Sequence, residues 1–252
     1  MDTMRIAIVG YGKMGKMIHM AADRAGHDVK VIVDPFSNDK NVTVQEVRYI
    51  KKQDFDCLID FSSPKTIIDN MKFYIDNAIP AVIGTTGWYD RLDEVKAMAE
   101  GTGAKLIWSG NYSLGVAVTM EIIRRAGQLF NKLDNYSVAV NEVHHRHKLD
   151  APSGTGIMIA NVLVDELDGK TRYTTNLNAQ KDEISLTSQR IGEVPGIHTV
   201  TFDALEDTIT IQHSARTREG FANGAVKAAS WIIEQKPGVY CMDDFLSDFF
   251  RN

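Results

Sequence analysis

Apolar and polar positions in the first half of the chain alternate between short apolar runs of strand length and amphipathic stretches of helical spacing. The expected strands lie at 4–9, 29–33, 57–61, 81–83 and 106–108. The apolar residues that follow the first strand at helical spacing, up to Gly26, are Met14, Met17, Ile18, Ala21 and Ala25. Further helices are expected to open at Ser63 and Pro64, and to span about 90–100 and about 114–133. This alternation predicts a parallel, doubly wound α/β sheet.

Strand patterns predominate in the second half. They lie at 136–143, 183–189, 197–204 and 208–213, with a hairpin turn expected at 205–207. One helical pattern runs from Ile157 to Leu167, and an alanine-rich one at 221–234 is expected to return to the first domain. The polar stretch 168–181 is expected to be a long connection without secondary structure. We therefore predict an N-terminal domain of residues 1–114 and 219–252, and a smaller C-terminal α+β domain, mostly a β sheet, of residues 115–218.

A glycine-rich turn directly follows the first strand. Its residues are Gly10, Tyr11, Gly12, Lys13, Met14 and Gly15. They match the G-x-G-x-x-G pattern between a strand and a helix, and the second strand ends in the acid Asp34. Glycines there permit a tight turn and a close approach of the backbone to a pyrophosphate, while Asp34 can accept hydrogen bonds from the adenosine ribose. The first domain is therefore predicted to be a Rossmann-type dinucleotide-binding domain with its cofactor at this turn.

Two further strand ends carry polar loops that contain glycine. One loop holds Gly84, Thr85 and Thr86, and the other holds Ser109, Gly110, Asn111 and Tyr112. The carboxyl ends of parallel strands meet at one edge of a sheet, where ligands of such folds bind. We expect both loops to join the glycine turn in the cofactor site.

The densest group of titratable side chains lies at 142–150. Five consecutive positions hold His144, His145, Arg146, His147 and Lys148, which include three of the seven histidines. Histidine titrates near neutral pH, and lysine can serve as a general acid. If the chain turns helically here, four-residue spacing places His144 and Lys148 on one face. The sequence predicts proton transfer by this pair and leaves the division of the work between them open.

The same segment continues into a predicted helix start at Pro152, Ser153, Gly154 and Thr155. Backbone N–H groups near Gly154, Thr155 and Gly156 would then lack intrahelical partners at the positive end of the helix dipole. A carboxylate or phosphate fits such a position. Together with the basic run, this predicts a site that binds an anion and protonates it.

Composition narrows the classes of protein that fit. The chain has 252 residues, of which 44% are hydrophobic and 24% charged, as in ordinary soluble globular proteins. No apolar run approaches the roughly 18 residues that span a bilayer. A net charge of -5 argues against a nucleic-acid partner. Cys57 and Cys241 show no C-x-x-C spacing, which favours reduced thiols and a cytoplasmic protein.

Five motifs occur in an order that resembles a known family. They are the glycine turn at 10–15, Gly-Thr-Thr-Gly at 84–87, Asn-Tyr-Ser at 111–113, the run at 142–155 and Phe-Ala-Asn-Gly-Ala at 221–225. Over nearly its whole length the chain resembles the bacterial 4-hydroxy-tetrahydrodipicolinate reductases, formerly called dihydrodipicolinate reductases. The resemblance implies NAD(P)H-dependent reduction of a small cyclic imine with two carboxylates, in diaminopimelate and lysine biosynthesis. It also implies a cytoplasmic homotetramer assembled through the C-terminal β layer.

The resemblance further implies roles for single residues. His144 corresponds to a proton donor or acceptor and Lys148 to a proton donor. Substrate binding is implied for His145, Gly154 and Thr155. The nucleotide contacts that it implies are 10–15, Asp34, 84–86 and 109–112.

The choice between NADH and NADPH depends on the residues after Asp34. Some members of the family carry a basic residue there, whereas this chain has Pro35 and Phe36. Asp34 would face the 2'-phosphate of NADPH with like charge, and Lys13 is the nearest evident base. We expect NADH to be used at least as well as NADPH.

Three alternatives stay open at the level of sequence. The histidines, flanked by Glu142 and Asp150, could ligate a metal in a hydrolase, although the neighbouring lysine and arginine repel a cation, so we expect no metal site. The chain could be a dinucleotide sensor without catalytic activity, since a fold does not prescribe chemistry. Within the enzymes, a reductase similar to homoserine or aspartate dehydrogenase is the second candidate.

Overall fold

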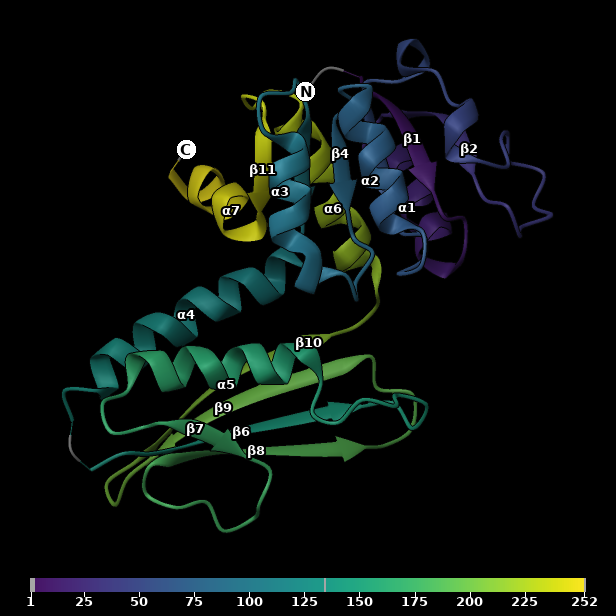
Figure 1. Ribbon diagram of the computed structural model, residues 1–252. Helices are drawn as coiled ribbons and strands as arrows, with labels where there is room; N and C mark the ends of the chain where they lie inside the picture. The colour runs from purple at the N-terminus through teal and green to yellow at the C-terminus, as the bar shows by residue number, and fades with distance from the viewer. Residues whose placement is uncertain (1–2, 134, 252) are drawn as a thin grey trace. The chain divides into compact units, whose positions relative to one another are not determined.

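A computed structural model describes residues 3–133 and 135–251 of the chain (Figure 1). The chain divides into two compact units, one of Met1–Ser113 with Glu219–Asn252 and one of Leu114–Arg218. Cofactor binding by unit 1, and substrate binding and assembly by unit 2, stay predictions.

Unit 1 contains a six-stranded sheet in which every neighbouring pair of strands is parallel. The order is β2-β1-β3-β4-β5-β11. The bounds are β1 (Arg5–Val9), β2 (Asp28–Val33), β3 (Cys57–Asp60), β4 (Ala81–Ile83), β5 (Lys105–Trp108) and β11 (Gly238–Cys241). The chain leaves β1 for β2 on one side and returns as β3 on the other, which makes a topological switch point between β1 and β3. The predicted doubly wound sheet is confirmed.

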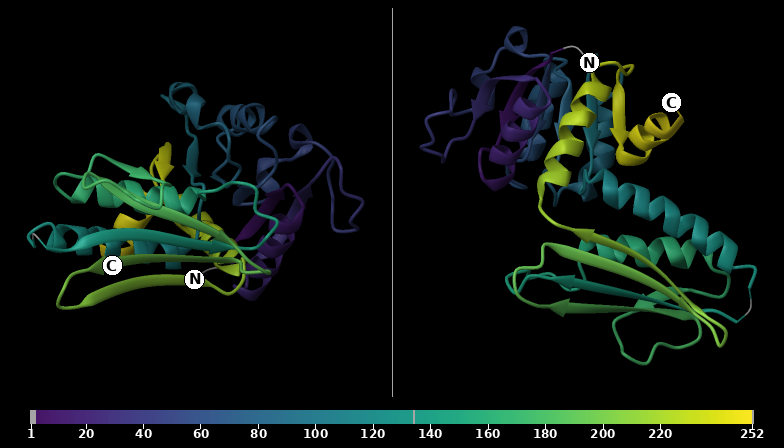
Figure 2. Two further views of the ribbon diagram at one scale, coloured as in Figure 1. Left: turned by 90° about the horizontal axis from the view of Figure 1, so that it is seen from below. Right: turned by 180° about the vertical axis from the view of Figure 1, so that it is seen from behind.

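Helices cover both faces of this sheet, which explains why its central strands are apolar throughout rather than alternating. The helices are α1 (Lys13–Arg24), α2 (Ile67–Asp76), α3 (Leu92–Ala99), α6 (Glu219–Ile232) and α7 (Met242–Arg251), with short 3₁₀ turns at Val47–Tyr49, Lys52–Asp54 and Tyr89–Arg91. Helices α1 and α6 lie side by side behind the sheet, and α2 and α3 lie in front of it (Figures 1 and 2). The expected return of the last alanine-rich helix to the first domain is confirmed.

Two features of unit 1 differ from the sequence-based prediction. Helix α2 begins at Ile67 and not at Ser63 and Pro64, because residues 64–66 form a separate turn. In that turn the Ser63 hydroxyl accepts a hydrogen bond from Lys65 N, and the Thr66 hydroxyl donates to Ser63 O. Strand β11 and helix α7 were not predicted. The strand has only four residues and begins at Gly238, directly after Pro237, which gives too short a pattern.

Unit 2 contains a five-stranded mixed sheet in the order β10-β9-β6-β8-β7. The bounds are β6 (Ser137–His144), β7 (Arg172–Thr174), β8 (Glu183–Arg190), β9 (Gly196–Asp203) and β10 (Thr208–Ala215). Helices α4 (Leu114–Phe130) and α5 (Gly154–Glu166) pack against each other on one face of the sheet (Figure 1). The predicted mostly β layer and its hairpin turn at 205–207 are confirmed, and Ala204 N bonds to Asp207 O across that turn. The expectation of no structure at 168–181 was wrong, because β7 pairs with the start of β8 over only three residues, too few for a visible pattern.

The central strand β6 places the candidate site. Alternate residues face the helices, so Val138 and Val140 join the apolar core, followed on the same face by Glu142 and His144. All four of these residues are buried. The face of β6 that begins as core therefore ends as a buried group of titratable side chains.

Candidate active site

Glu142 is the centre of a buried polar cluster in unit 2. Its side chain is 0% exposed, and both carboxylate oxygens accept hydrogen bonds from Ser153 N, at 3.0 and 3.1 Å. The Ser153 hydroxyl donates to Glu142 Oε2, and the Arg190 guanidinium donates to Oε1 at 3.2 Å. Burial raises the pKa of the Glu142 carboxyl, but the hydrogen bonds from Ser153, together with smaller effects of Ser188 and His144, bring the pKa below its ordinary value. Glu142 is therefore a buried anion with its charge compensated.

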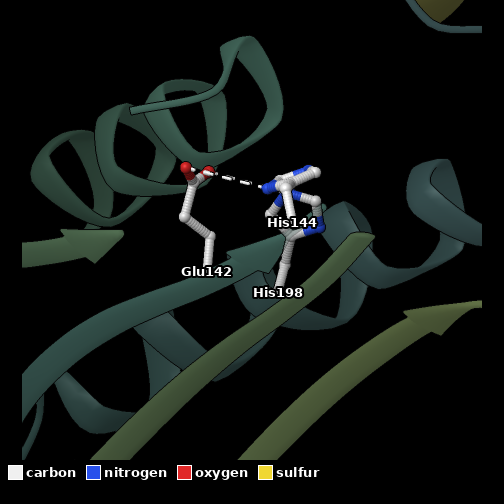
Figure 3. Close-up of side chains that lie close together, drawn as sticks. All are labelled: Glu142, His144 and His198. Carbon is white, nitrogen blue, oxygen red and sulfur yellow. Dashed lines mark ion pairs between the residues drawn. The ribbon is translucent and has the colours of Figure 1, made fainter. Parts of the chain in front are cut away.

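Two imidazoles lie beside this carboxylate (Figure 3). His144 Nδ1 is 3.8 Å from Glu142 Oε1, and His198 Nε2 is 3.8 Å from Oε2. The two rings meet edge to face with their centres 5.1 Å apart. Burial lowers the pKa of both histidines, to about 4 for His198, where the nearby His144 adds to the effect. Both rings are neutral at neutral pH.

His198 was not predicted from the sequence. It comes from β9, where Glu142 and His198 are direct partners in the antiparallel pairing with β6. The only available signal was its place at an inward position of an alternating strand. Such a position is usually apolar, and the sequence alone does not say which strand lies opposite.

Lys148 and Asp150 lie in the loop after β6. Lys148 Nζ pairs with Asp150 Oδ1 at 2.8 Å, and Lys148 O accepts a hydrogen bond from Arg190 Nε at 3.4 Å. The expected helical spacing of His144 and Lys148 was wrong, because His144 is the last residue of β6 and the next residues form a turn. Lys148 and Arg190 nevertheless act electrostatically on His144: after burial and the opposing effect of Glu142, both lower its pKa.

The other two histidines of the run lie apart from Glu142. His145 Nε2 is 3.4 Å from an Arg218 nitrogen, whereas His147 is exposed and pairs with Glu193 at 3.5 Å. Arg146 is exposed. The histidines of the run therefore have three different surroundings. His144 is buried, His145 lies beside Arg218, and His147 faces solvent. Arg218 was also missed, since it is distant in sequence and belongs to no motif.

Helix α5 begins as predicted, with Ser153 as its cap. The Ser153 hydroxyl accepts a hydrogen bond from Gly156 N at 3.0 Å, so this N–H is not available to a ligand. A Cβ at Gly156 would lie 2.6 Å from Glu142 Oε2, which means that only glycine permits this close approach. Gly154 is exposed, and nothing lies within 4 Å of a Cβ built on it. The helix start at Gly154 therefore has room for an anion.

Among the described residues, one group has donor atoms close enough together for a metal ion. It consists of Glu142, His144 and His198, whose donor atoms all lie within 4.8 Å of one another. Their chemistry does not fit one. Both oxygens of Glu142 already accept hydrogen bonds from Ser153, and Oε1 also accepts one from the Arg190 guanidinium. A divalent ion would have to displace these donors next to a fixed cation.

In unit 1 the glycine turn lies at the switch point. Gly10 has φ +87°, and a Cβ there would overlap the carbonyl of Phe61 at the end of β3. Helix α1 begins after Gly12 without a side-chain cap, and Lys13, its first residue, is exposed. A helix start of this kind binds pyrophosphate oxygens.

Asp34 lies directly after β2 with its carboxylate bonded to neighbouring backbone. Tyr11 N donates to Oδ2 at 2.7 Å, and Phe36 N and Ser37 N donate to Oδ1 at 2.8 and 3.0 Å. These bonds connect the acid to the glycine turn. They fix the position of its carboxylate.

In the other two loops the side chains of Thr85, Ser109 and Tyr112 are buried, Asn111 is half-buried and Thr86 is exposed. Tyr112 is 1% exposed, and its hydroxyl donates to Ile83 O and Ile107 O, both at 3.0 Å. The Thr85 hydroxyl donates to the buried Asp60 at 3.0 Å, an acid that sequence reasoning missed. Any contact that Thr85 or Tyr112 makes with a nucleotide in this arrangement is through the backbone.

A doubly wound sheet with a glycine turn at its switch point and an acid after β2 defines the class of dinucleotide-binding proteins. Models of the two halves of dihydrodipicolinate reductase match nearly the whole chain, the N-terminus at residues 4–112 and the C-terminus at residues 115–246. The chain belongs to the dihydrodipicolinate reductase family. It is therefore an oxidoreductase that uses a pyridine nucleotide, as its sequence predicted.

Individual relatives agree with this assignment. The chain is 36% identical over 249 residues to a 4-hydroxy-tetrahydrodipicolinate reductase of Christiangramia forsetii, which covers 99% of this chain and 100% of the relative. It is 35% identical over 242 residues to the enzyme of that name from Caldanaerobacter subterraneus subsp. tengcongensis, covering 93% and 94% of the two chains.

Solved structures show the same fold. A dipicolinate-bound dihydrodipicolinate reductase from Paenisporosarcina sp. TG-14 matches with a TM-score of 0.78 at 22% identity, over 95% of this chain and 98% of that one. An aspartate dehydrogenase from Thermotoga maritima matches with a TM-score of 0.51 at 14% identity, over 93% and 98%. Within the described residues, no helix has both the length and the apolar character needed to cross a membrane.

Proposed function

We propose that the chain catalyses the NAD(P)H-dependent reduction of 4-hydroxy-tetrahydrodipicolinate to tetrahydrodipicolinate in diaminopimelate and lysine biosynthesis. The observation that carries the proposal is its similarity, over 99% of its length, to a relative named for this reaction. The substrate is a small cyclic imine with two carboxylates. It needs positive groups to bind it, a hydride donor and a proton donor.

Binding of the substrate carboxylates is assigned to two groups in unit 2. One is the pair of basic side chains His145 and Arg218, and the other is the start of helix α5. His145 and Arg218 lie 3.4 Å apart and together present charged or polar N–H donors. Gly154 and Thr155 begin helix α5 at the positive end of its dipole. Charge-assisted hydrogen bonds from such groups to a carboxylate are about twice as strong as neutral ones.

Proton transfer is assigned to Lys148 and His144. The 4-hydroxyl group of the substrate must leave as water, which gives a conjugated imine. The reduced nicotinamide would supply the hydride to this imine when it is bound, and the electron-rich enamine that results must take up a proton. The Lys148 ammonium, paired with Asp150, carries a proton and is the proposed donor. His144 is buried and neutral, so it can take up a proton and pass it on. General acid–base catalysis of this kind contributes typically ~10²- to 10⁴-fold.

The cofactor is assigned to the carboxyl edge of the sheet in unit 1, at 10–15, Asp34, 84–86 and 109–112. Asp34 is the acid after β2, and neither Pro35 nor Phe36 brings a compensating cation. Lys16 is paired with Asp39 at 2.8 Å, which leaves Lys13 as the exposed base of the turn. These charges favour NADH, used at least as well as NADPH.

We further propose that the enzyme works in the cytoplasm as a homotetramer assembled through the sheet of unit 2. Both helices of this unit lie on one face of the sheet, and no helix among its described residues covers the other face (Figures 1 and 2). That open face carries small polar side chains such as Asn141, Thr187 and Thr199. Cys57 and Cys241 are free thiols, and free thiols are common in proteins of reducing compartments.

A coupled assay tests the proposed reaction. Pyruvate and aspartate semialdehyde are condensed enzymatically, and the purified chain is added with NADH or NADPH while absorbance of the reduced cofactor is followed. We expect oxidation that depends on the condensation product and persists after a chelator. No oxidation despite NADH binding would favour a sensor, and turnover of homoserine or aspartate instead would favour the second enzyme class.

A further inference from the structure

Glu142 contacts both halves of the candidate site. Its Oε1 faces His144 Nδ1 at 3.8 Å and accepts hydrogen bonds from Arg190 and Ser153 N. Its Oε2 accepts from Ser153 N at 3.1 Å and from the Ser153 hydroxyl, directly before the first residue of α5. One buried carboxylate therefore lies between the imidazole assigned to proton transfer and the helix start assigned to the substrate carboxylate.

We propose that Glu142 is a positioning residue for the reduction, whose negative charge holds His144 ready for proton exchange and holds the start of α5 at a fixed place beside it. This inference rests on the proposed function of His144. Glu142 acts through His144 and Ser153, since its own side chain is fully buried.

Packing alone does not explain a carboxylate at this position. Val138 and Val140 occupy the preceding inward positions of β6 and belong to the apolar core. Burying a charge is costly, and replacing a buried ion pair by apolar residues of similar volume is often neutral or stabilising. A carboxylate at the third inward position therefore points to a role in the site rather than in the core.

The charges around His144 give Glu142 a defined effect. Burial lowers the pKa of His144, Glu142 raises it, and Lys148 and Arg190 lower it further, while Asp150 raises it. Arg190 reaches the cluster from β8, His198 from β9 with His213 opposite it on β10, and Lys148 and Asp150 from the loop. Among these groups Glu142 is the strongest influence that favours a protonated His144.

The second part of the role is mechanical. Ser153 donates to Glu142 through both its N–H and its hydroxyl, and the same hydroxyl caps Gly156 N. The absence of a side chain at Gly156 lets the carboxylate approach the first turn of α5. The Glu142 contacts therefore fix the position of Gly154 and Thr155 relative to His144.

The test compares two changes at position 142. Glu142→Gln keeps the shape and removes the charge, whereas Glu142→Asp keeps the charge and shortens the side chain. We expect Glu142→Gln to lower kcat by roughly 10- to 100-fold, below the full contribution of an acid–base group. In the same variant the titration of His144, followed by NMR with ¹⁵N-labelled histidine and assigned by its loss in His144→Gln, should move to lower pH. Glu142→Asp should retain more kcat than Glu142→Gln.

Glu183 provides the matched control. It is 6% exposed, lies at the start of β8 and is paired at 2.8 Å with Arg172, whose side chain is exposed, so Glu183→Gln also removes a buried, paired carboxylate from this sheet. Glu183→Gln should reduce stability. Its kcat should stay within about twofold of the wild type, and the titration of His144 should not shift. Two results would overturn the proposal. One is an unchanged kcat together with an unshifted His144 titration in a folded Glu142→Gln variant. The other is a lower kcat in Glu142→Asp than in Glu142→Gln.

Arg190→Gln decides the matter if Glu142→Gln does not fold. Because Arg190 lowers the pKa of His144, its loss should move the titration to higher pH, opposite to the loss of Glu142. A His144 titration that stays in place in Arg190→Gln would then contradict the proposal. The NMR readout needs no turnover, so failure of the wild type in the coupled assay would count against the proposed function and not against the positioning of His144.

Discussion

Three inward histidines, His144, His198 and His213, lie on neighbouring strands of one sheet and are held neutral by burial. In the unfolded chain each would titrate near the ordinary histidine value of about 6.5. Between that pH and the lower folded pKa values the unfolded state binds more protons. Stability should therefore be lost as the pH falls from about 6.5 towards the folded pKa values.

His198 should dominate this loss, because its pKa in the fold is about 4. The difference between this pKa and the ordinary value of about 6.5 corresponds to roughly 3 kcal/mol of unfolding free energy once the pH lies below both. Urea denaturation at a series of pH values between 7.5 and 4.5 measures it, and His198→Asn should flatten the dependence on pH. His147→Asn is the control, since His147 is exposed, and should leave the slope as it is. An equal slope in wild type and His198→Asn would show that His198 is not held neutral.

Cofactor choice is a second question at the scale of single residues. Asp34→Ser removes the like charge from the 2'-phosphate and should raise kcat/KM for NADPH relative to NADH. Lys13→Ala removes the exposed base of the glycine turn and should lower that ratio. Steady-state kinetics with both cofactors measure the effect. A wild type that prefers NADPH tenfold, or ~1.4 kcal/mol in transition-state stabilisation, would contradict the assignment.

At the scale of elements, the start of α5 is assigned to a substrate carboxylate. Gly154 is the first residue of the helix, where proline is tolerated, and Ser153 already has the extended backbone that precedes a proline. Gly154→Pro therefore removes one N–H donor while the helix remains. KM for the dicarboxylate should rise by roughly 10-fold or more, as expected for a hydrogen bond to a charged group.

Thr155→Val is the comparison, because it removes a hydroxyl and retains the backbone N–H. Its KM should change less than that of Gly154→Pro. Wild-type KM in both variants would place the substrate elsewhere. Thermal melting of both proteins checks that helix α5 is intact.

Local sequence patterns were sufficient to predict most helices and strands. They were not sufficient to predict which residues meet across neighbouring strands. Apolar runs, the glycine turn and Ser153 as a cap are local signals, and the strands and helices that they predict are present. β7 and β11 have three and four residues, too few for a period to appear. His198 joins Glu142 only through the register of β9 against β6, and Arg218 meets His145 across 73 residues of sequence. The spacing of residues along the sequence does not predict such long-range pairs.

At the scale of the whole molecule, the open face of the sheet in unit 2 is assigned to assembly. Thr199 lies on this face between Asn141 on β6 and Gln212 on β10. Thr199→Arg should reduce the sedimentation coefficient from that of a tetramer, because it places an unpaired charge in the interface. Leu205→Arg is the control, since Leu205 is 98% exposed in the hairpin turn. A monomeric wild type, or a tetramer in Thr199→Arg, would contradict the assignment of this face.

We propose that Lys148 supplies the proton for the reduction and that the cofactor binds at the glycine turn. The most direct measurement compares wild type and Lys148→Ala in the coupled assay, with the NADH dissociation constant determined on the same preparations. We expect turnover by the wild type, a kcat lower by ~10²-fold or more in Lys148→Ala, and an unchanged NADH dissociation constant. A wild type that does not oxidise NADH with the condensation product, or a variant that loses NADH affinity as much as rate, would contradict the proposal.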